Sequence, residues 1–315
     1  MVVARRRSCP PVPDDENEAR TVTTAPVTTA PATTAPENPA PWTLSGFGDE
    51  IDPDPVVQVA VLRALGAHSI EVRSAWGRNV VDLDDERLAR LAAVLERGGQ
   101  SVSAVASPIG KVDVALDPEL EVARLDRVIR AAHALGTPSI RVFSFYRGEG
   151  VPVESIRDDV LLRLRMLADR AEREGVVLLH ENEKDIYGDV PERILDLVES
   201  VGSPALRLAW DNANFVQCGV RPFDDGWTAL RPYVDYLQVK DAVAATGTVV
   251  PAGEGDGQLR ETLTALRDDG WTGVASLEPH LAITDALGGF SGPESFGVAA
   301  RAFRGLASSL GIDLR

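Results

Sequence analysis

Short β-rich runs alternate along the chain with longer runs whose apolar residues recur at helical spacing. The alternation begins near Trp42 and continues to the C-terminus. Each short run holds six or seven residues and is rich in Val, Ile, Leu and aromatic side chains, which is typical of buried strands. We predict eight strands, at residues 43–48, 69–74, 101–107, 139–145, 176–181, 206–211, 236–241 and 273–278.

Helices are predicted between the strands because apolar residues there follow the i, i+3, i+4, i+7 spacing of one helix face. Three runs show this pattern most clearly, at residues 88–95, 125–135 and 156–171. The last two are followed by Gly136 and Gly175. Glycine readily adopts the left-handed conformation found just beyond a helix C-terminus, so these two glycines mark helix ends.

The order of these elements predicts an α/β protein with a (β/α)8, or TIM, barrel. Eight β–helix units follow one another between residues 42 and 315, with strand starts about 25 to 38 residues apart. An open, doubly wound sheet has fewer strands and favours a glycine-rich first turn. The first turn here is GFGDEIDPDP, which lacks the G-x-G-x-x-G pattern. The closed barrel therefore fits better than the open sheet.

The N-terminal residues have a different composition, and we expect two parts in the chain. Residues 1–41 form a Thr/Pro/Ala-rich tail that contains the tandem pentads TTAPV, TTAPA and TTAPE. This composition has too little apolar surface to offset the entropy of ordering, so we predict a disordered or extended tail. A glycosylated stalk is the alternative, and it is weaker because no export signal precedes the repeats. Residues 42–315 form the barrel.

Charge and composition narrow the choice of partners. The formal net charge is -16, from 48 acidic and 32 basic residues, and such a surface repels phosphate backbones. We therefore expect no nucleic-acid partner. No apolar run approaches the length of about 18 residues that spans a bilayer, so no membrane partner is expected. Two cysteines exclude a disulfide framework and a cysteine-based zinc site. These features predict a cytoplasmic protein, and a homo-oligomer is left open.

Carboxylates stand at the ends of three predicted strands. Glu181, Asp211 and Glu278 each follow several apolar residues. In a barrel of this kind the carboxyl ends of the strands meet at one mouth, where the active site lies. A salt-bridge network would explain one such carboxylate, but three together need either several cations or one divalent metal ion. The metal is the more economical explanation. Lys240 and Gln238 share one face of the strand at 236–241 and point to the same mouth.

Five short motifs together resemble the xylose isomerase-like barrels. They are SLEP (276–279), HENE (180–183), DNAN (211–214), VKD (239–241) and PAGEGDG (251–257). The resemblance covers residue 45 to the C-terminus, and its motifs are specific only as a set. That group contains sugar and sugar-phosphate isomerases and epimerases, inosose-pathway enzymes and an endonuclease IV branch. The shortage of histidines, four in the chain, excludes the last branch, which needs many for its three zinc ions.

The resemblance implies one divalent metal ion and a set of catalytic residues. The metal ligands would be Glu181, Asp211, Glu278 and the residue at position 238. Glu181 and Glu278 would transfer the proton through a metal-stabilised enediolate, and Lys240 would neutralise the developing oxyanion. An ordinary ion pair with Asp211 or Glu278 is the structural alternative for Lys240.

These residues predict a metal-dependent isomerase or epimerase whose small-molecule partner is a sugar or keto-sugar. A lyase or dehydratase that acts on a 3-keto sugar or cyclitol through the same enolate chemistry is the alternative. A second alternative is a non-catalytic barrel that binds a sugar or a protein and has a degenerate metal site.

Two departures from the family pattern affect the metal site. Gln238 and Asn214 stand where relatives carry histidines. The remaining ligands, three carboxylates and an amide oxygen, are all hard oxygen donors. They favour Mn²⁺ or Mg²⁺ over zinc. The missing histidine at position 238 is also what keeps the degenerate, non-catalytic alternative open.

Further polar and aromatic residues near the predicted mouth are candidates for binding substrate. They are Glu71, Arg73, Trp76, Tyr146, Asn214, Glu254 and His280. A buried ion pair is the structural alternative for Glu71 and Arg73, and barrel capping is the alternative for the aromatic residues. His180 has the opposite strand parity to Glu181, so we expect it to point toward the helices and to pack there.

Overall fold

The computed structural model describes residues 40–281 and 291–315. The predicted tail lies outside the described residues, except for its last two positions. Among the helices of the described residues, none combines the length and the apolar character that crossing a membrane requires.

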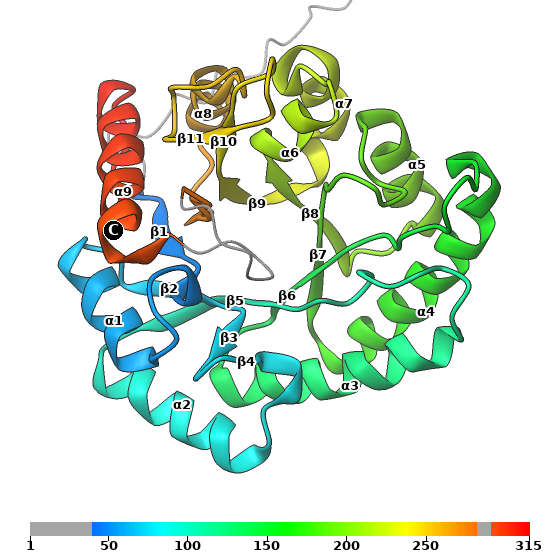
Figure 1. Cartoon of the computed structure of the whole chain (residues 1–315), viewed down its shortest axis with the longest axis horizontal. Helices are drawn as coiled ribbons and strands as arrows, with labels where there is room; N and C mark the ends of the chain where they lie inside the picture. The colour runs from blue at the N-terminus through cyan, green and yellow to red at the C-terminus, as the bar shows by residue number, and fades with distance from the viewer. Residues whose placement is uncertain (1–39, 282–290) are drawn as a thin grey trace, which may run out of the picture. The chain divides into compact units, whose positions relative to one another are not determined.

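Eight parallel strands form the sheet at the centre of the molecule (Figure 1). Their order is β1-β12-β9-β8-β7-β6-β5-β2, and every pairing within it is parallel. A parallel bridge between Phe47 and Glu71 links the end of β1 to β2, which closes the sheet into a barrel. The strands are β1 (Thr43–Gly46), β2 (Ser69–Val72), β5 (Ser101–Ala106), β6 (Ser139–Val142), β7 (Val177–Glu181), β8 (Leu206–Asp211), β9 (Val234–Val239) and β12 (Val274–Leu277).

Helices lie outside the strands and follow them in the chain (Figure 1). They are α1 (Pro55–Ala64), α2 (Asp85–Arg97), α3 (Pro118–Leu135), α4 (Arg157–Glu174), α5 (Pro191–Val201), α6 (Asn212–Gln217), α7 (Thr228–Leu230), α8 (Leu259–Asp268) and α9 (Gly292–Ser309). Two short hairpins decorate the mouth, β3 (Ser74–Ala75) with β4 (Arg78–Asn79) and β10 (Asp241–Ala242) with β11 (Val249–Val250). The architecture confirms the predicted (β/α)8 barrel.

Local sequence explains where the helices begin and end. Asp54, Asp84 and Asp117 cap α1, α2 and α3 by accepting a hydrogen bond from a backbone N–H of the first turn. At the other end, α3 and α4 stop at Gly136 and Gly175, which have φ values of 72° and 68°. The predicted helix ends are therefore found, and the conformation there is the left-handed one that glycine adopts without strain.

The barrel has an apolar layer on each side of its strands. Between strands and helices, fully buried residues such as Leu164, Phe215 and Phe303 belong to one large core. Inside the barrel, the small cluster of Ala104, Leu179, Ala209 and Tyr236 fills the lower interior. The interior is therefore closed below and becomes polar only toward the C-terminal ends of the strands, where the mouth lies.

Candidate active site

A pocket of about 440 Å³ opens at the mouth of the barrel. Its walls come from the C-terminal ends of the strands and the loops that follow them, which is where this architecture places active sites. The lining residues are Arg73, Asn79, Ala106, Pro108, Lys111, Arg141, Tyr146, Glu181, Glu183, Lys240, Glu278 and His280.

Three buried carboxylates converge beside this pocket, as predicted from the strand ends. Glu181 is the last residue of β7, Asp211 is the last residue of β8, and Glu278 directly follows β12. One carboxylate oxygen of each residue lies within 4.8 Å of the others. Glu181 and Glu278 line the pocket, and Asp211 lies beneath it without exposure to solvent.

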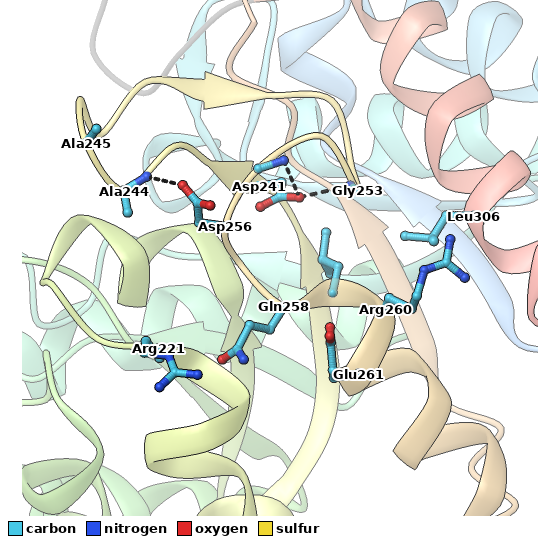
Figure 2. Close-up of a pocket in the computed structure, with 12 residues that line it drawn as sticks. Arg221, Asp241, Ala244, Ala245, Gly253, Asp256, Gln258, Arg260, Glu261 and Leu306 are labelled. Carbon is cyan, nitrogen blue, oxygen red and sulfur yellow. Dashed lines mark hydrogen bonds between the residues drawn. The ribbon is translucent and has the colours of Figure 1, made fainter.

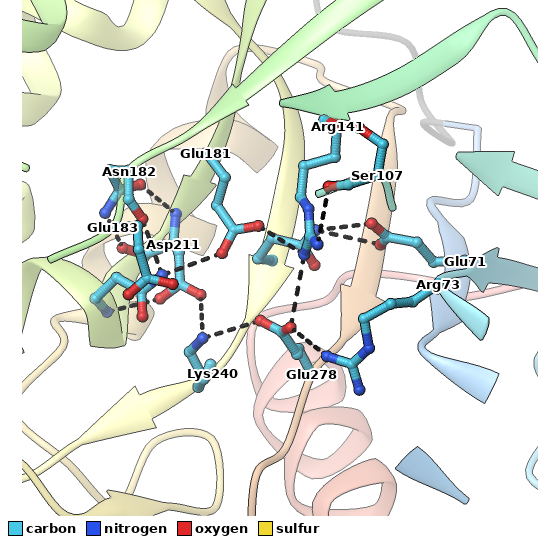
Figure 3. A network of polar contacts seen from close by, with 12 residues as sticks. Glu71, Arg73, Ser107, Arg141, Glu181, Asn182, Glu183, Asp211, Lys240 and Glu278 are labelled. Carbon is cyan, nitrogen blue, oxygen red and sulfur yellow. Dashed lines mark hydrogen bonds and ion pairs between the residues drawn. The ribbon is translucent and has the colours of Figure 1, made fainter. Parts of the chain in front are cut away.

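Lys240 lies between two of these carboxylates (Figure 3). Its Nζ is 2.9 Å from Asp211 Oδ2 and 2.9 Å from Glu278 Oε2. The ammonium is itself buried, so its charge is compensated by these contacts instead of by water. The structural ion pair considered for Lys240 is therefore present, and with both partners at once. Lys240 also lines the pocket, so a substrate can reach its ammonium group despite these two ion pairs.

Arg141 is a further candidate functional residue, which the strand ends did not reveal. It lies inside β6 and is buried, and its Nη1 is 3.0 Å from Glu181 Oε2 and 3.7 Å from Glu278 Oε1 (Figure 3). The guanidinium carbon lies 5.3 Å from the ring centre of Phe47 and 4.7 Å from that of Phe143. Two aromatic faces thus hold the cation between two carboxylates. An arginine inside an apolar strand was the available signal, the same one that marked Glu71 and Arg73.

Two further cations reach Glu278 from the β1 and β2 side of the mouth. Arg73 Nη1 is 3.3 Å from Glu278 Oε1, and its Nε donates to Asp49 Oδ2 at 2.8 Å. His280 Nε2 is 2.9 Å from Glu50 Oε1 and 3.5 Å from Glu278 Oε1. Although burial lowers the pKa of His280, the Glu278 carboxylate raises it to about 9. His280 is therefore an imidazolium at neutral pH.

Glu71 does not form the ion pair with Arg73 that was the structural alternative to substrate binding. It is fully buried in the barrel, where its carboxylate accepts hydrogen bonds from the Tyr236 hydroxyl at 2.9 Å and from Gln238 Nε2 at 3.1 and 3.2 Å. Burial raises the pKa of Glu71 to about 7. Its place is under the pocket, among neutral donors from β9.

Burial and the neighbouring cations together drive the pKa values of the converging carboxyl groups apart. Burial raises the pKa of Asp211 to about 7, although Lys240 opposes the shift. It also raises the pKa of Glu181. Burial acts in the same direction on Glu278, but Lys240 and His280 bring its pKa well below the usual value. The pKa of Glu278 is thus lowered and those of Asp211 and Glu181 are raised, and further positive charge nearby would favour the ionised forms of the latter two.

The donor set suits a hard divalent cation. Glu181, Asp211 and Glu278 each offer a carboxylate oxygen to the same small volume. Gln238, which pairs with Asp211 across β8 and β9, has a buried amide oxygen that accepts no hydrogen bond from the residues that the structure describes. Oxygen donors of this kind are the ligands that magnesium and manganese prefer. Glu278 also belongs to a second group that could hold a metal ion, with Glu50 and His280.

The remaining substrate-binding candidates divide into residues that line the pocket and residues that do not. Arg73, Tyr146 and His280 line the pocket together with the catalytic candidates. Asn214 is buried, and its Nδ2 donates to Glu181 Oε1 at 3.1 Å, so it orients a carboxylate.

The other candidates, Trp76 and Glu254, are not among the residues that line the pocket. The guanidinium of Arg90, from α2, covers the Trp76 ring at 4.7 Å. Glu254 is exposed on the loop between β11 and α8.

His180 packs against the helix layer, on the side of β7 opposite to Glu181. It lies beside Ile194 of α5 and Trp210 of β8. Neither of its ring nitrogens has a hydrogen-bond partner within the described ranges 40–281 and 291–315. Burial lowers the pKa of His180 to about 3, so the ring is neutral. The expected packing position is found.

The glycine-rich loop after β11 is built around Asp241. The Asp241 carboxylate accepts backbone hydrogen bonds from Ala242, Gly253, Gly255 and Gly257 at 2.9 to 3.1 Å. A Cβ at Gly255 or Gly257 would lie 2.4 or 2.6 Å from Asp241 Oδ1, so both positions require glycine.

A hollow of about 700 Å³ lies beside this loop, and Figure 2 shows Asp241 and Gly253 in its wall. Within the described residues, neither group of candidate metal ligands lies there. Asp241 therefore anchors the loop and takes no part in the carboxylate cluster.

Comparisons with known proteins agree with this fold. Residues 59–294 match the family model described as xylose isomerase-like TIM barrel. The chain is 33% identical over 220 residues to the 2-epi-5-epi-valiolone 7-phosphate 2-epimerase of Actinoplanes sp. strain SE50/110. That match covers 68% of this chain and 78% of the relative.

Two solved structures have the same fold. A D-tagatose 3-epimerase-like protein superimposes with a TM-score of 0.69 at 15% identity, over 86% of this chain and 98% of the other. A Mycobacterium smegmatis xylose isomerase-like TIM barrel protein in complex with magnesium gives a TM-score of 0.61 at 20% identity, over 86% and 97%.

These comparisons settle the family and the class of enzyme. The epimerase relative confirms the prediction of an enzyme of the isomerase and epimerase class. The family match extends over most of the described barrel, from α1 to the start of α9, and includes all three converging carboxylates. The chain belongs to the xylose isomerase-like TIM barrel family.

Proposed function

We propose that the protein is a metal-dependent epimerase or isomerase of a small polyhydroxylated ketone, a keto-sugar or a cyclitol ketone. The observation that carries this proposal is the meeting of Glu181, Asp211 and Glu278 within 4.8 Å at a pocket of small-molecule size. The relative named as an epimerase of a valiolone phosphate supports the choice of a cyclic ketone as substrate.

The metal would be held by Glu181, Asp211, Glu278 and the amide oxygen of Gln238. The all-oxygen donor set favours Mn²⁺ or Mg²⁺. When bound, such an ion acts as a Lewis acid that lowers the energy of the negative charge developing on the substrate.

The two carboxylates that line the pocket would move the proton. Glu181 and Glu278 come from β7 and β12, and Arg141 Nη1 contacts both, which fixes their relative orientation. Epimerisation needs one group to take the proton from one face of a carbon and another to return a proton to the opposite face. A pair of carboxyl groups, one ionised and one protonated, can perform both steps, and their roles exchange during each turnover.

The cations at the mouth would bind and stabilise the substrate oxygens. Lys240 and Arg141 both line the pocket and are held in place by buried carboxylates. Their positive charges are therefore preorganised to face an enolate-like oxygen without reorganisation during the reaction. Tyr146 and Asn79 also line the pocket and provide donors for substrate hydroxyl groups.

The test is incubation of the Mn²⁺-supplied protein with a panel of keto-sugars and cyclitol ketones, with and without a phosphate group, in deuterated water. We expect deuterium at one carbon together with a product of inverted or shifted configuration. Glu181→Gln and Glu278→Gln should lower the rate by about 10²- to 10⁴-fold. Glu96→Gln, on the exposed face of α2, should leave it unchanged.

The same experiment separates the alternatives. Release of water or another group from the substrate, in place of an epimerised product, would indicate that the protein is a lyase. No exchange with any ketone of the panel, from protein that also takes up no metal, would leave a binding protein with a degenerate site.

A further inference from the structure

Gln238 lies beside the carboxylate cluster with one half of its amide paired and the other half unpaired. Nε2 donates to Glu71 Oε1 at 3.1 Å and to Glu71 Oε2 at 3.2 Å. Oε1 is buried and accepts no hydrogen bond from residues 40–281 or 291–315. A buried carbonyl oxygen without a donor costs about 1–3 kcal/mol. This oxygen therefore lies among polar groups, and no group of the described residues donates a hydrogen bond to it.

The register of β9 places this amide next to the cluster. Gln238 pairs with Asp211 of β8 on one side and with Ser276 of β12 on the other. Two residues further along the same face of the strand, Lys240 contacts Asp211 and Glu278. Gln238 therefore lies at the level of Asp211, inside the barrel and two residues before Lys240 along the strand.

Glu71 decides which end of the amide faces which way. The Glu71 carboxyl group holds the NH₂ end of Gln238 through both of its oxygens, so the carbonyl oxygen is turned away from it. Glu71 is held in turn by the Tyr236 hydroxyl at 2.9 Å, which bonds to Ser103 Oγ at 2.9 Å. Without this acceptor the amide has no reason to prefer one orientation, because its two ends have nearly the same shape.

We propose that Glu71 is a positioning residue that orients Gln238 so that the amide oxygen completes the cation site of Glu181, Asp211 and Glu278. This inference rests on the proposed function and deepens its metal site. It accounts for an oxygen at a position where an imidazole nitrogen is the familiar ligand. Glu71 contacts neither substrate nor metal, and it acts through Gln238 in the way that outer-shell carboxylates orient metal ligands.

The test measures Mn²⁺ affinity on the full chain after chelator treatment, by isothermal titration calorimetry and by the EPR spectrum of the bound ion. The variants are Glu71→Gln, Gln238→Met and the double variant. We expect each single variant to bind Mn²⁺ about 10- to 100-fold more weakly with an altered spectrum. The double variant should bind no more weakly than Gln238→Met alone, because Glu71 has no effect once its amide partner is gone.

Glu121→Gln is the matched control. Glu121 is also buried, and it bonds to the Gly110 backbone N–H at 2.6 Å and to Arg124 at 2.8 Å, away from the cluster. Its Mn²⁺ affinity and spectrum should equal those of the unmodified protein. Should Glu71→Gln fold poorly by circular dichroism, Gln238→Met still tests the proposal, because it leaves Glu71 in place.

Two results overturn the proposal in different ways. Wild-type affinity and spectrum in Glu71→Gln would remove its positioning role, and the same result in Gln238→Met would remove the amide from the site. Either result would leave the three-carboxylate site intact. Absence of Mn²⁺ binding by the unmodified protein would overturn the metal site itself and the proposed function with it.

Discussion

The two halves of the barrel mouth carry opposite charges and were unequally visible in the sequence. The half formed by β7, β8 and β12 supplies the carboxylates Glu181, Asp211 and Glu278, each at a strand end. The half formed by β2 and β6 supplies Arg73 and Arg141, which reach across to the same carboxylates. The three carboxylates of the acidic half could hold a cation without the arginines. The arginines of the basic half could act only on these carboxylates or on a substrate bound beside them.

This difference assigns separate tasks to the two halves. Removal of an acidic residue should abolish metal binding and catalysis together. Removal of a basic residue should impair turnover. The metal ion should remain bound, because the removed positive charge competes with the ion for the carboxylates. Each of the following predictions tests this separation.

The largest effect is expected from Glu278→Gln. Glu278 is the carboxylate shared by Lys240, Arg73 and His280, so its neutralisation disturbs both halves. We expect Mn²⁺ affinity to fall by at least about 100-fold and kcat by about 10²- to 10⁴-fold. Calorimetry and steady-state kinetics on the same preparation check this, and a variant that binds metal normally would remove Glu278 from the ligand set.

Arg141→Met should give the second-largest effect, on turnover alone. It keeps an unbranched side chain between the Phe47 and Phe143 rings and removes the charge that faces Glu181. We expect kcat to fall by about 10²-fold with unchanged or tighter Mn²⁺ binding. Loss of metal from this variant would show that the two halves are not separable.

Asp241→Ala should leave both halves intact while it loosens the neighbouring loop. Four backbone N–H groups lose their acceptor, so the free energy of unfolding should fall by about 3 kcal/mol. Urea denaturation measures this loss, and Mn²⁺ affinity is the companion measurement. A strong loss of Mn²⁺ affinity at unchanged stability would contradict the role of Asp241 as a loop anchor.

The smallest effect comes from the outer face of β7, at His180. Burial lowers its pKa to about 3, whereas the unperturbed value is 6.5. Between these values only the unfolded state binds the proton, so stability decreases as the pH falls below about 6.5. The contribution of His180 at pH 5 should be a loss of about 2 kcal/mol relative to pH 7.5, measured as the difference in pH dependence between the unmodified protein and His180→Leu. Equal pH dependence of both proteins in urea denaturation would refute it.

The fold and the acidic half were predictable because they depend on local patterns. The period of apolar residues marked all eight strands, and strand ends placed Glu181, Asp211 and Glu278 at one mouth. Those predictions need only the rule that parallel strands end on the same side.

The basic half and the lower polar layer were less predictable because they depend on contacts across the barrel. Arg141 lies within a strand, and its partners come from strands 40 or more residues away in the chain. For Glu71, substrate binding was predicted and an ion pair with Arg73 was the alternative, but it bonds to Tyr236 and Gln238 across the interior. Strand parity shows that a side chain points inward, but it does not show which partner lies opposite at that depth.

The most direct test of the account is the metal content of the purified protein. After dialysis against Mn²⁺ and removal of free ions, mass spectrometry of the metal should find one manganese ion per chain in the unmodified protein and in Arg141→Met. It should find almost none in Glu181→Gln. Equal metal content in Glu181→Gln and the unmodified protein, or none in either, would contradict the claim that the three carboxylates form a cation site.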